Sequence, residues 1–126
     1  ELACQRMTEE DMQALEEAQK AFKAAIDQGD AMKIAETDEA YHDVIYHSTR
    51  NKRLVQILNN LREQMYRFRL EYIKDEDKRQ ILQLEHEKIL AALRLRHMAE
   101  AKAVASGHID NQEITVLKNL KERKEV

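Results

Sequence analysis

The sequence predicts an all-α protein, an antiparallel bundle of about six helices. It has 126 residues with no proline and two glycines, while 36% of its residues are charged and 5% are aromatic. A sheet protein needs turn-forming residues roughly every 8–12 positions, which this chain cannot supply. Apolar residues instead recur at helical spacing. The length suffices for one core, so we expect a single domain over residues 1–126.

The first long helix has recognisable signals at both ends. Thr8-Glu9-Glu10-Asp11 has the Ser/Thr-x-x-acid form of a capping box, which predicts a helix start. Gly29 ends the apolar pattern, because glycine enters the left-handed cap conformation at little cost, and Asp30 can cap the next helix. The apolar stripe between these ends consists of Met12, Leu15, Ala18, Phe22, Ala25 and Ile26.

Two more helices are expected between Asp30 and Ile73. The first runs to the polar stretch Ser48-Thr49-Arg50-Asn51, and the second is one helix from about Lys52 to Ile73. Each of these helices carries one face on which mainly apolar residues recur at helical spacing. These faces are Ile34, Asp38, Tyr41, His42 and Ile45, then Leu54, Ile57, Leu58, Leu61, Met65, Phe68 and Tyr72.

The last part of the chain predicts further helices with a weaker boundary between them. Asp75-Glu76-Asp77 places negative charge where a helix N-terminus favours it. The stretch from Arg94 to His97 is a turn candidate that lacks glycine, and a helix follows from about Met98. The pattern leaves open whether that helix breaks at Gly107. The stripe after Asp75 is Leu82, His86, Ile89, Leu90 and Leu93.

Polar residues occupy positions on these stripes where apolar ones are expected. Asp38 and His42 stand one turn apart, so both side chains point at the same region, which is metal-chelating geometry. His86 and His108 repeat the pattern on two later helices. Three imidazoles and one carboxylate converging in a bundle suit Zn, Ni, Co, Mn or Fe(II).

A plainer interpretation remains open for each of these residues. A histidine on a half-apolar face is commonly a hydrogen-bonded core residue, and Asp38 with His42 can be a simple ion pair. His47 lies about 140° around the helix from His42, and His97 falls in the expected turn, so neither is expected to bind metal.

Several motifs together resemble the FCD family, the effector-binding domains of FadR-type GntR regulators. Asp38-Glu39-Ala40-Tyr41-His42 is similar to the family's D-x-x-[FY]-H motif, and the match continues through Ser48-x-x-Asn51 and Leu54. Glu85-His86-x-x-Ile89-x-x-Ala92-Leu93 resembles its E-H-x-x-I-x-x-A-I motif. His108 then falls in register with the family's last metal histidine.

The resemblance implies a bundle with a central pocket for a metal and a ligand. It implies one divalent ion, zinc or nickel first and manganese, cobalt or iron also, bound by Asp38, His42, His86 and His108. It further implies a small carboxylate metabolite as effector and a homodimer. The family has arginine at the position of Arg67, whereas helical geometry places Arg69 nearer the apolar stripe. Tyr41 and Tyr72 are candidate hydroxyl donors to the effector.

The family's regulators bind DNA through an N-terminal winged helix-turn-helix, which is not present in this chain. The net charge of −3 and the even mixing of charges predict no DNA binding by the domain itself. The chain opens in helix without an initiator methionine, as expected of a fragment. With one cysteine and no apolar run of bilayer length, we expect a cytoplasmic protein without membrane contact.

Two other functions compete with a non-enzymatic sensor. An open metal site can activate water, as in a hydrolase or lyase. We expect no such enzyme, because carboxylates near the ligands, such as Glu39 and Glu85, are explicable as helix surface and leave no general base. The other alternative is a purely structural helical interaction domain without a small ligand.

Overall fold

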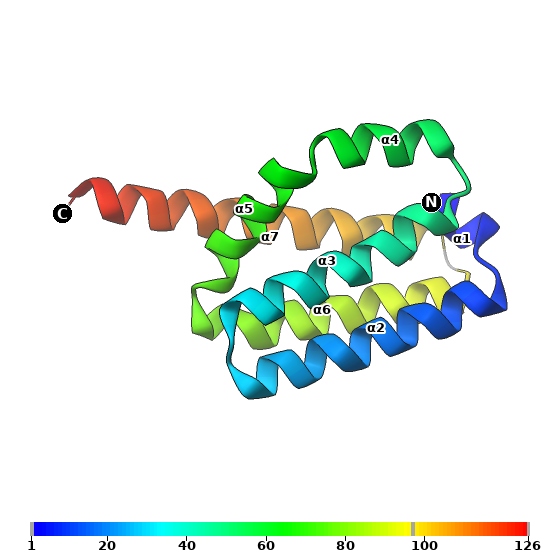
Figure 1. The fold of residues 1–126 in the computed structure, drawn as a ribbon, viewed down its shortest axis with the longest axis horizontal. Helices are drawn as coiled ribbons and strands as arrows, with labels where there is room; N and C mark the ends of the chain where they lie inside the picture. Colours follow the sequence, from blue (N-terminus) through cyan, green and yellow to red (C-terminus); the bar gives the residue numbers. More distant parts are fainter. Residues whose placement is uncertain (1, 97, 126) are drawn as a thin grey trace.

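The chain folds into a bundle of helices (Figure 1). The computed structural model describes the backbone of residues 2–96 and 98–125 and the side chains of residues 2–96, 102–114 and 117. Within these ranges every regular element is an α-helix, which confirms the all-α prediction. The helices are α1 (Leu2–Arg6), α2 (Glu9–Gln28), α3 (Ala31–Ser48), α4 (Lys52–Asn60), α5 (Arg62–Ile73), α6 (Glu76–Arg94) and α7 (Met98–Glu125).

The predicted signals around α2 and α3 are confirmed. Thr8 and Asp11 form the reciprocal capping box at the start of α2. Gly29 ends α2 in the left-handed conformation with φ of 75°. The Asp30 carboxylate caps α3 by accepting from the backbone N–H groups of Met32 and Lys33.

The single helix predicted from Lys52 to Ile73 was wrong. The chain bends at Leu61, whose N–H bonds to the carbonyl of Leu58, three residues back, and α5 leaves α4 at an angle (Figure 1). Two residues of the predicted apolar stripe are therefore exposed, Ile57 at 49% and Leu61 at 46%. The bend turns α5 onto α3 and α7, so tertiary packing overrides a periodicity that continues across the break.

The weak turn predicted between Arg94 and His97 is present without glycine. Arg96 adopts φ of 60°, a left-handed conformation that costs roughly 1 kcal/mol for a non-glycine residue. Its guanidinium donates hydrogen bonds to the carbonyls of Cys4 (2.8 Å) and Met7, which ties the end of α6 to α1. Beyond this turn α7 continues through Gly107 without a break. His97 lies outside the described residues.

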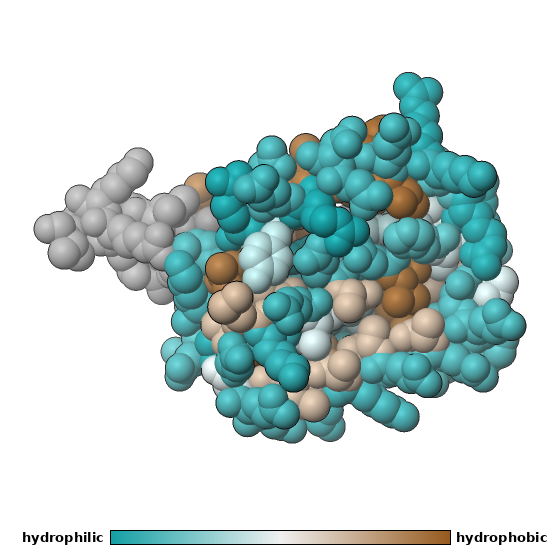
Figure 2. Space-filling model, in the orientation of Figure 1, coloured by the Kyte–Doolittle hydropathy of each residue, from teal (hydrophilic) through white to brown (hydrophobic). Residues whose placement is uncertain are grey.

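Five helices enclose the centre of the bundle. Helix α2 packs against α3 and α6, α3 against α5, and α7 against both α5 and α6. Figure 2 shows one face of this arrangement, which is covered mainly by hydrophilic residues. These contacts close a ring of helices in the order α2, α3, α5, α7 and α6. Helix α3 therefore faces α6 and α7 across the centre of the bundle, and side chains fill the space between them. None of the described helices is long and apolar enough to cross a membrane.

Candidate metal centre

Asp38 and His42 point into the bundle centre from α3. Their side chains are one helical turn apart, and Asp38 Oδ1 lies 3.3 Å from His42 Nε2. Asp38 is fully buried, and His42 is 7% exposed. Burying an ionised carboxylate costs free energy unless the carboxylate is paired or binds a cation. Asp38 is therefore expected to have partners on the other helices.

The partners come from α6 and α7. His86 Nε2 lies 2.8 Å from Asp38 Oδ1, and His108 completes a group in which one donor atom per residue lies within 4.8 Å of every other. All four residues are buried. The structure thus brings together the four residues that the sequence singled out, from three helices of the bundle.

The donor atoms of this group lack ordinary hydrogen-bond partners. Apart from the close contacts between members of the group, no described residue forms a hydrogen bond with either Asp38 carboxylate oxygen or with Nε2 of His42, His86 or His108. Buried polar atoms in native proteins nearly always have a hydrogen-bond partner. Several buried atoms without one at a single point therefore indicate that a further partner binds there. Donors around a tetrahedral zinc ion lie roughly 3.4 Å apart, a value within the range found here. The residues therefore fit a divalent cation.

The protonation states favour metal binding. Burial lowers the pKa of His42 to about 3, despite the nearby Asp38 charge, and burial also lowers the pKa of His86. For Asp38, burial acts to raise the pKa, but the attraction and the hydrogen bonding of His42 and His86 outweigh it and hold the pKa well below its ordinary value. At neutral pH Asp38 therefore offers an ionised carboxylate, and His42 and His86 offer neutral imidazoles, the forms that bind metals.

We expect the metal-free domain to lose stability as the pH falls from 6.5 towards 3. Between these values the unfolded chain protonates His42, whereas the fold holds its pKa at about 3, so the free energy of unfolding decreases with falling pH. At pH 4.5 this group accounts for a loss of about 3 kcal/mol. Urea denaturation at pH 7 and pH 4.5 measures the change. The His42→Gln variant is the control, and an equal pH dependence in both proteins would contradict the assignment.

Aromatic rings orient His86. The Tyr41 ring stacks on the imidazole with a centroid distance of 4.0 Å, and the Phe22 ring lies 4.4 Å away on α2. The Tyr41 hydroxyl donates to the backbone carbonyl of His86 at 2.7 Å. The hydroxyl expected to serve the effector is thus engaged in holding α3 against α6.

Glu85 is a functional residue that sequence reasoning missed. It was expected on the helix surface, but it is 8% exposed, and its Oε2 accepts a hydrogen bond from His108 Nδ1. A carboxylate oxygen can only accept, so the proton sits on Nδ1 and the lone pair on Nε2 faces the other donors. Asn111 Nδ2 holds the second Glu85 oxygen at 2.7 Å. Carboxylates commonly orient metal-binding histidines in this way.

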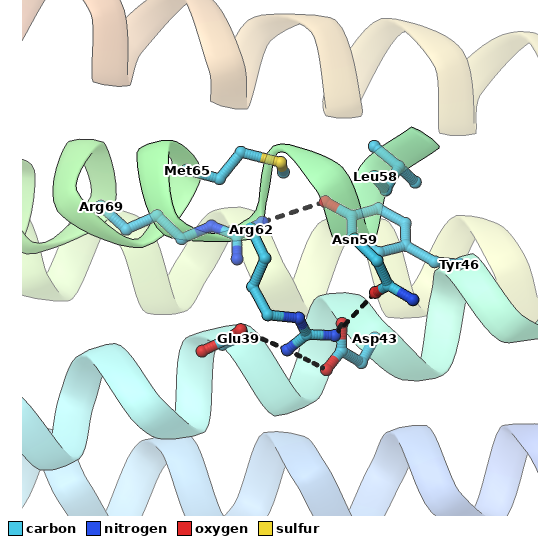
Figure 3. Close-up of a pocket in the computed structure, with 8 residues that line it drawn as sticks. All are labelled: Glu39, Asp43, Tyr46, Leu58, Asn59, Arg62, Met65 and Arg69. Atoms are coloured by element: carbon cyan, nitrogen blue, oxygen red, sulfur yellow. Dashed lines mark hydrogen bonds and ion pairs between the residues drawn. The ribbon is translucent and has the colours of Figure 1, made fainter. Parts of the chain in front are cut away.

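Arg69 lies beside the group. It is 6% exposed, its Nε lies 3.4 Å from Asp38 Oδ2, and its Nη2 donates to the Tyr46 hydroxyl at 2.9 Å (Figure 3). Arg67 is exposed on the same helix, as expected for a residue two positions away, about 200° around. Tyr72 is buried, which raises its pKa to about 12, and its hydroxyl has no hydrogen-bond partner among the described residues.

An ion-pair cluster covers the outer side of Arg69. Arg62, at the start of α5, binds Glu39 and Asp43 of α3, the latter at 3.2 Å (Figure 3). Arg62 and Arg69 both line a cavity of about 10 Å³, enough for about one water molecule. Glu39 thus serves to join α3 to α5.

Comparison with known proteins identifies the family to which this domain belongs. The chain matches the model of the FCD domain over residues 1–111, a segment that contains all four members of the buried group. None of the curated proteins compared with the chain matches it. FCD domains are regulatory ligand-binding domains of GntR-type regulators. On this match over most of its length, the chain belongs to the FCD domain family.

Proposed function

We propose that the domain binds one divalent metal ion through Asp38, His42, His86 and His108 and uses it to sense a small organic acid. The observation that carries this proposal is the set of buried donor atoms from three helices that have no hydrogen-bond partners among the described residues outside the group. Zinc and nickel suit three imidazoles and a carboxylate best, and manganese, cobalt and iron also accept this set. When bound, the ion supplies a Lewis-acidic position that can accept an effector carboxylate.

The charge of the centre supports an anionic effector. A divalent ion together with Arg69 outweighs the two buried carboxylates, Asp38 and Glu85, and leaves a net positive charge. The guanidinium of Arg69 is planar and can bind a carboxylate with two parallel hydrogen bonds. Arg69 is buried beside the donors, whereas Arg67 is exposed, so we assign the effector anchor to Arg69. Tyr72 offers a further hydroxyl donor.

Ligand binding at this centre acts on several helices at once. The donors lie on α3, α6 and α7, and Arg69 adds α5, so an effector that prefers one packing arrangement shifts their equilibrium. In a full-length, dimeric cytoplasmic regulator this shift would change how the winged helix-turn-helix domains fit the operator.

The neighbouring carboxylates favour a sensor over a metal-dependent hydrolase or lyase. A hydrolase requires a carboxylate or imidazole free to take a proton from water. Glu39 pairs with Arg62, and Glu85 accepts from both His108 and Asn111. These contacts give both groups structural roles.

Thermal unfolding of the domain with and without metal tests this function. We expect organic acids to stabilise the metal-loaded domain, by about 2.7 kcal/mol for a ligand at a hundred times its Kd, and to have no effect on the metal-stripped domain. Arg69→Lys keeps the charge but loses the fork, so it should weaken binding about tenfold. Arg67→Lys is the matched control on the exposed face. Equal stabilisation of stripped and loaded protein would refute the proposal.

A further inference from the structure

A groove between α5 and α7 opens beside the metal centre. It has a volume of about 310 Å³, within the range of small-molecule pockets. Its walls are mainly apolar and include Leu61 at the bend before α5, Met65 and Phe68 from α5, and Ile109 from α7. Leu61 and Ile109 are 46% and 53% exposed, so the groove presents apolar side chains to solvent.

Two buried polar side chains join the groove to the metal centre. Arg69 lines the groove and also lies 3.4 Å from Asp38 through its Nε atom. Gln112 lines the groove one helical turn after His108 on α7. Gln112 is 2% exposed, yet its Nε2 has no hydrogen-bond partner among the described residues. An unsatisfied donor at this depth costs about 1–3 kcal/mol unless a ligand accepts from it.

We propose that this groove holds the apolar portion of the effector, which makes the effector a monocarboxylate with an aliphatic or aromatic tail. This inference rests on the proposed function, because the carboxylate head must reach the metal and Arg69. An enclosed apolar cavity of about 150 Å³ accepts one benzene ring, so the groove admits a tail of roughly six to ten carbon atoms. Gln112 Nε2 donates to the head group where the tail begins. A small, highly polar polyacid satisfies the head but leaves the apolar walls exposed.

The chemistry of the two ends distinguishes this occupant from a second copy of the chain. Helix-to-helix docking would cover the apolar side chains of Leu61 and Ile109 but would leave Gln112 Nε2 without a buried acceptor. A carboxylate with an apolar tail satisfies both at once.

Titration of the metal-loaded domain with straight-chain carboxylates from acetate to octanoate tests the inference. Each methylene that enters the groove should raise the affinity two- to fourfold, as expected for burial of apolar surface. Acetate reports on the head-group site alone. Calorimetry gives the Kd of each acid, and the dependence of log Kd on chain length is the quantity to compare.

Two variants separate the groove from the head group. Ile109→Asn places an amide in the groove and should flatten the chain-length dependence while leaving acetate binding unchanged. Ile114→Asn is the matched control, since Ile114 is 66% exposed on the same helix and does not line the groove. Gln112→Leu should weaken all the acids by a similar factor and preserve the dependence. It removes the unpartnered amide, so the variant should remain folded.

The outcomes distinguish the two levels of the proposal. If acetate and octanoate bind metal-loaded protein equally well, the head-group site stands and the groove assignment is wrong. If no carboxylate binds metal-loaded protein at any chain length, the proposed function itself fails. If Ile109→Asn dissociates a dimer, as measured by sedimentation, without altering the chain-length dependence, the groove belongs to a second copy of the chain.

Discussion

Replacing His86 by alanine is expected to abolish tight metal binding. The imidazole contributes one of four buried donors, and structural metal sites derive about 10–16 kcal/mol from a full set. Loss of one donor should therefore cost about 3 kcal/mol, or at least a hundredfold in affinity. Elemental analysis of untagged protein after reconstitution should give about one metal ion per wild-type chain and far less for the variant.

Two further variants distinguish the loss of a metal ligand from simple misfolding. Asp38→Asn keeps the shape of the side chain and should also lose the ion, while circular dichroism reports on the helices. His47→Ala is the matched control, because His47 is exposed on α3 and its Nδ1 contacts only the backbone carbonyl of Asp43 among described residues. Chelation should lower the Tm of wild type and His47→Ala but leave His86→Ala unaffected. A His86→Ala domain that keeps a full equivalent would exclude His86 as a ligand.

Replacing Glu85 by alanine is expected to lower metal affinity by roughly 10- to 100-fold without removing a ligand. Glu85 holds the Nδ1 proton of His108 and so presents the Nε2 lone pair to the other donors. Without this carboxylate the ring can rotate or change tautomer. Competition with a chromophoric chelator measures the affinity. Glu85→Gln retains one acceptor oxygen and should show a smaller loss than Glu85→Ala.

Variants of Glu87 and Asn111 serve as comparisons for the Glu85 variants. Glu87 is exposed two residues later on α6, so Glu87→Ala changes the net charge equally and should leave the affinity within about twofold. Asn111→Ala should cause a loss smaller than that of Glu85→Ala, because it only frees the second Glu85 oxygen. Equal affinities for the Glu85 and Glu87 variants would show that His108 needs no carboxylate to orient it.

Local interactions explain why much of the fold could be predicted from the sequence. The capping box at Thr8, the left-handed Gly29 and the cap at Asp30 act within a few residues of themselves. The same holds for the spacing of Asp38 and His42, because one helical turn brings i and i+4 together whatever surrounds them. His86 and His108 were recognisable as polar residues on apolar stripes, and the resemblance to FCD domains placed them in one site.

Other features depend on contacts between distant segments, and these were predicted wrongly or left open. The bend at Leu61 interrupts a stripe whose spacing continues, because packing of α5 on α3 and α7 decides it. Glu85 and His86 belong to one sequence motif, but their side chains leave α6 in different directions. Only the packing of α7 against α6 shows that Glu85 contacts His108. The left-handed turn at Arg96 depends on carbonyls of residues about ninety positions earlier.

The all-α class, most of the helix ends and the four candidate metal ligands could thus be predicted without a structure, since each depends on local chemistry or on a helical face. The packed fold was needed to show that the four donors meet within 4.8 Å and that Arg69 is buried beside them while Arg67 is exposed. The tertiary structure also revealed the groove that leads to Gln112. The physical reason is that helical periodicity specifies which residues face inward, whereas the packing of α3, α5, α6 and α7 specifies which of them meet.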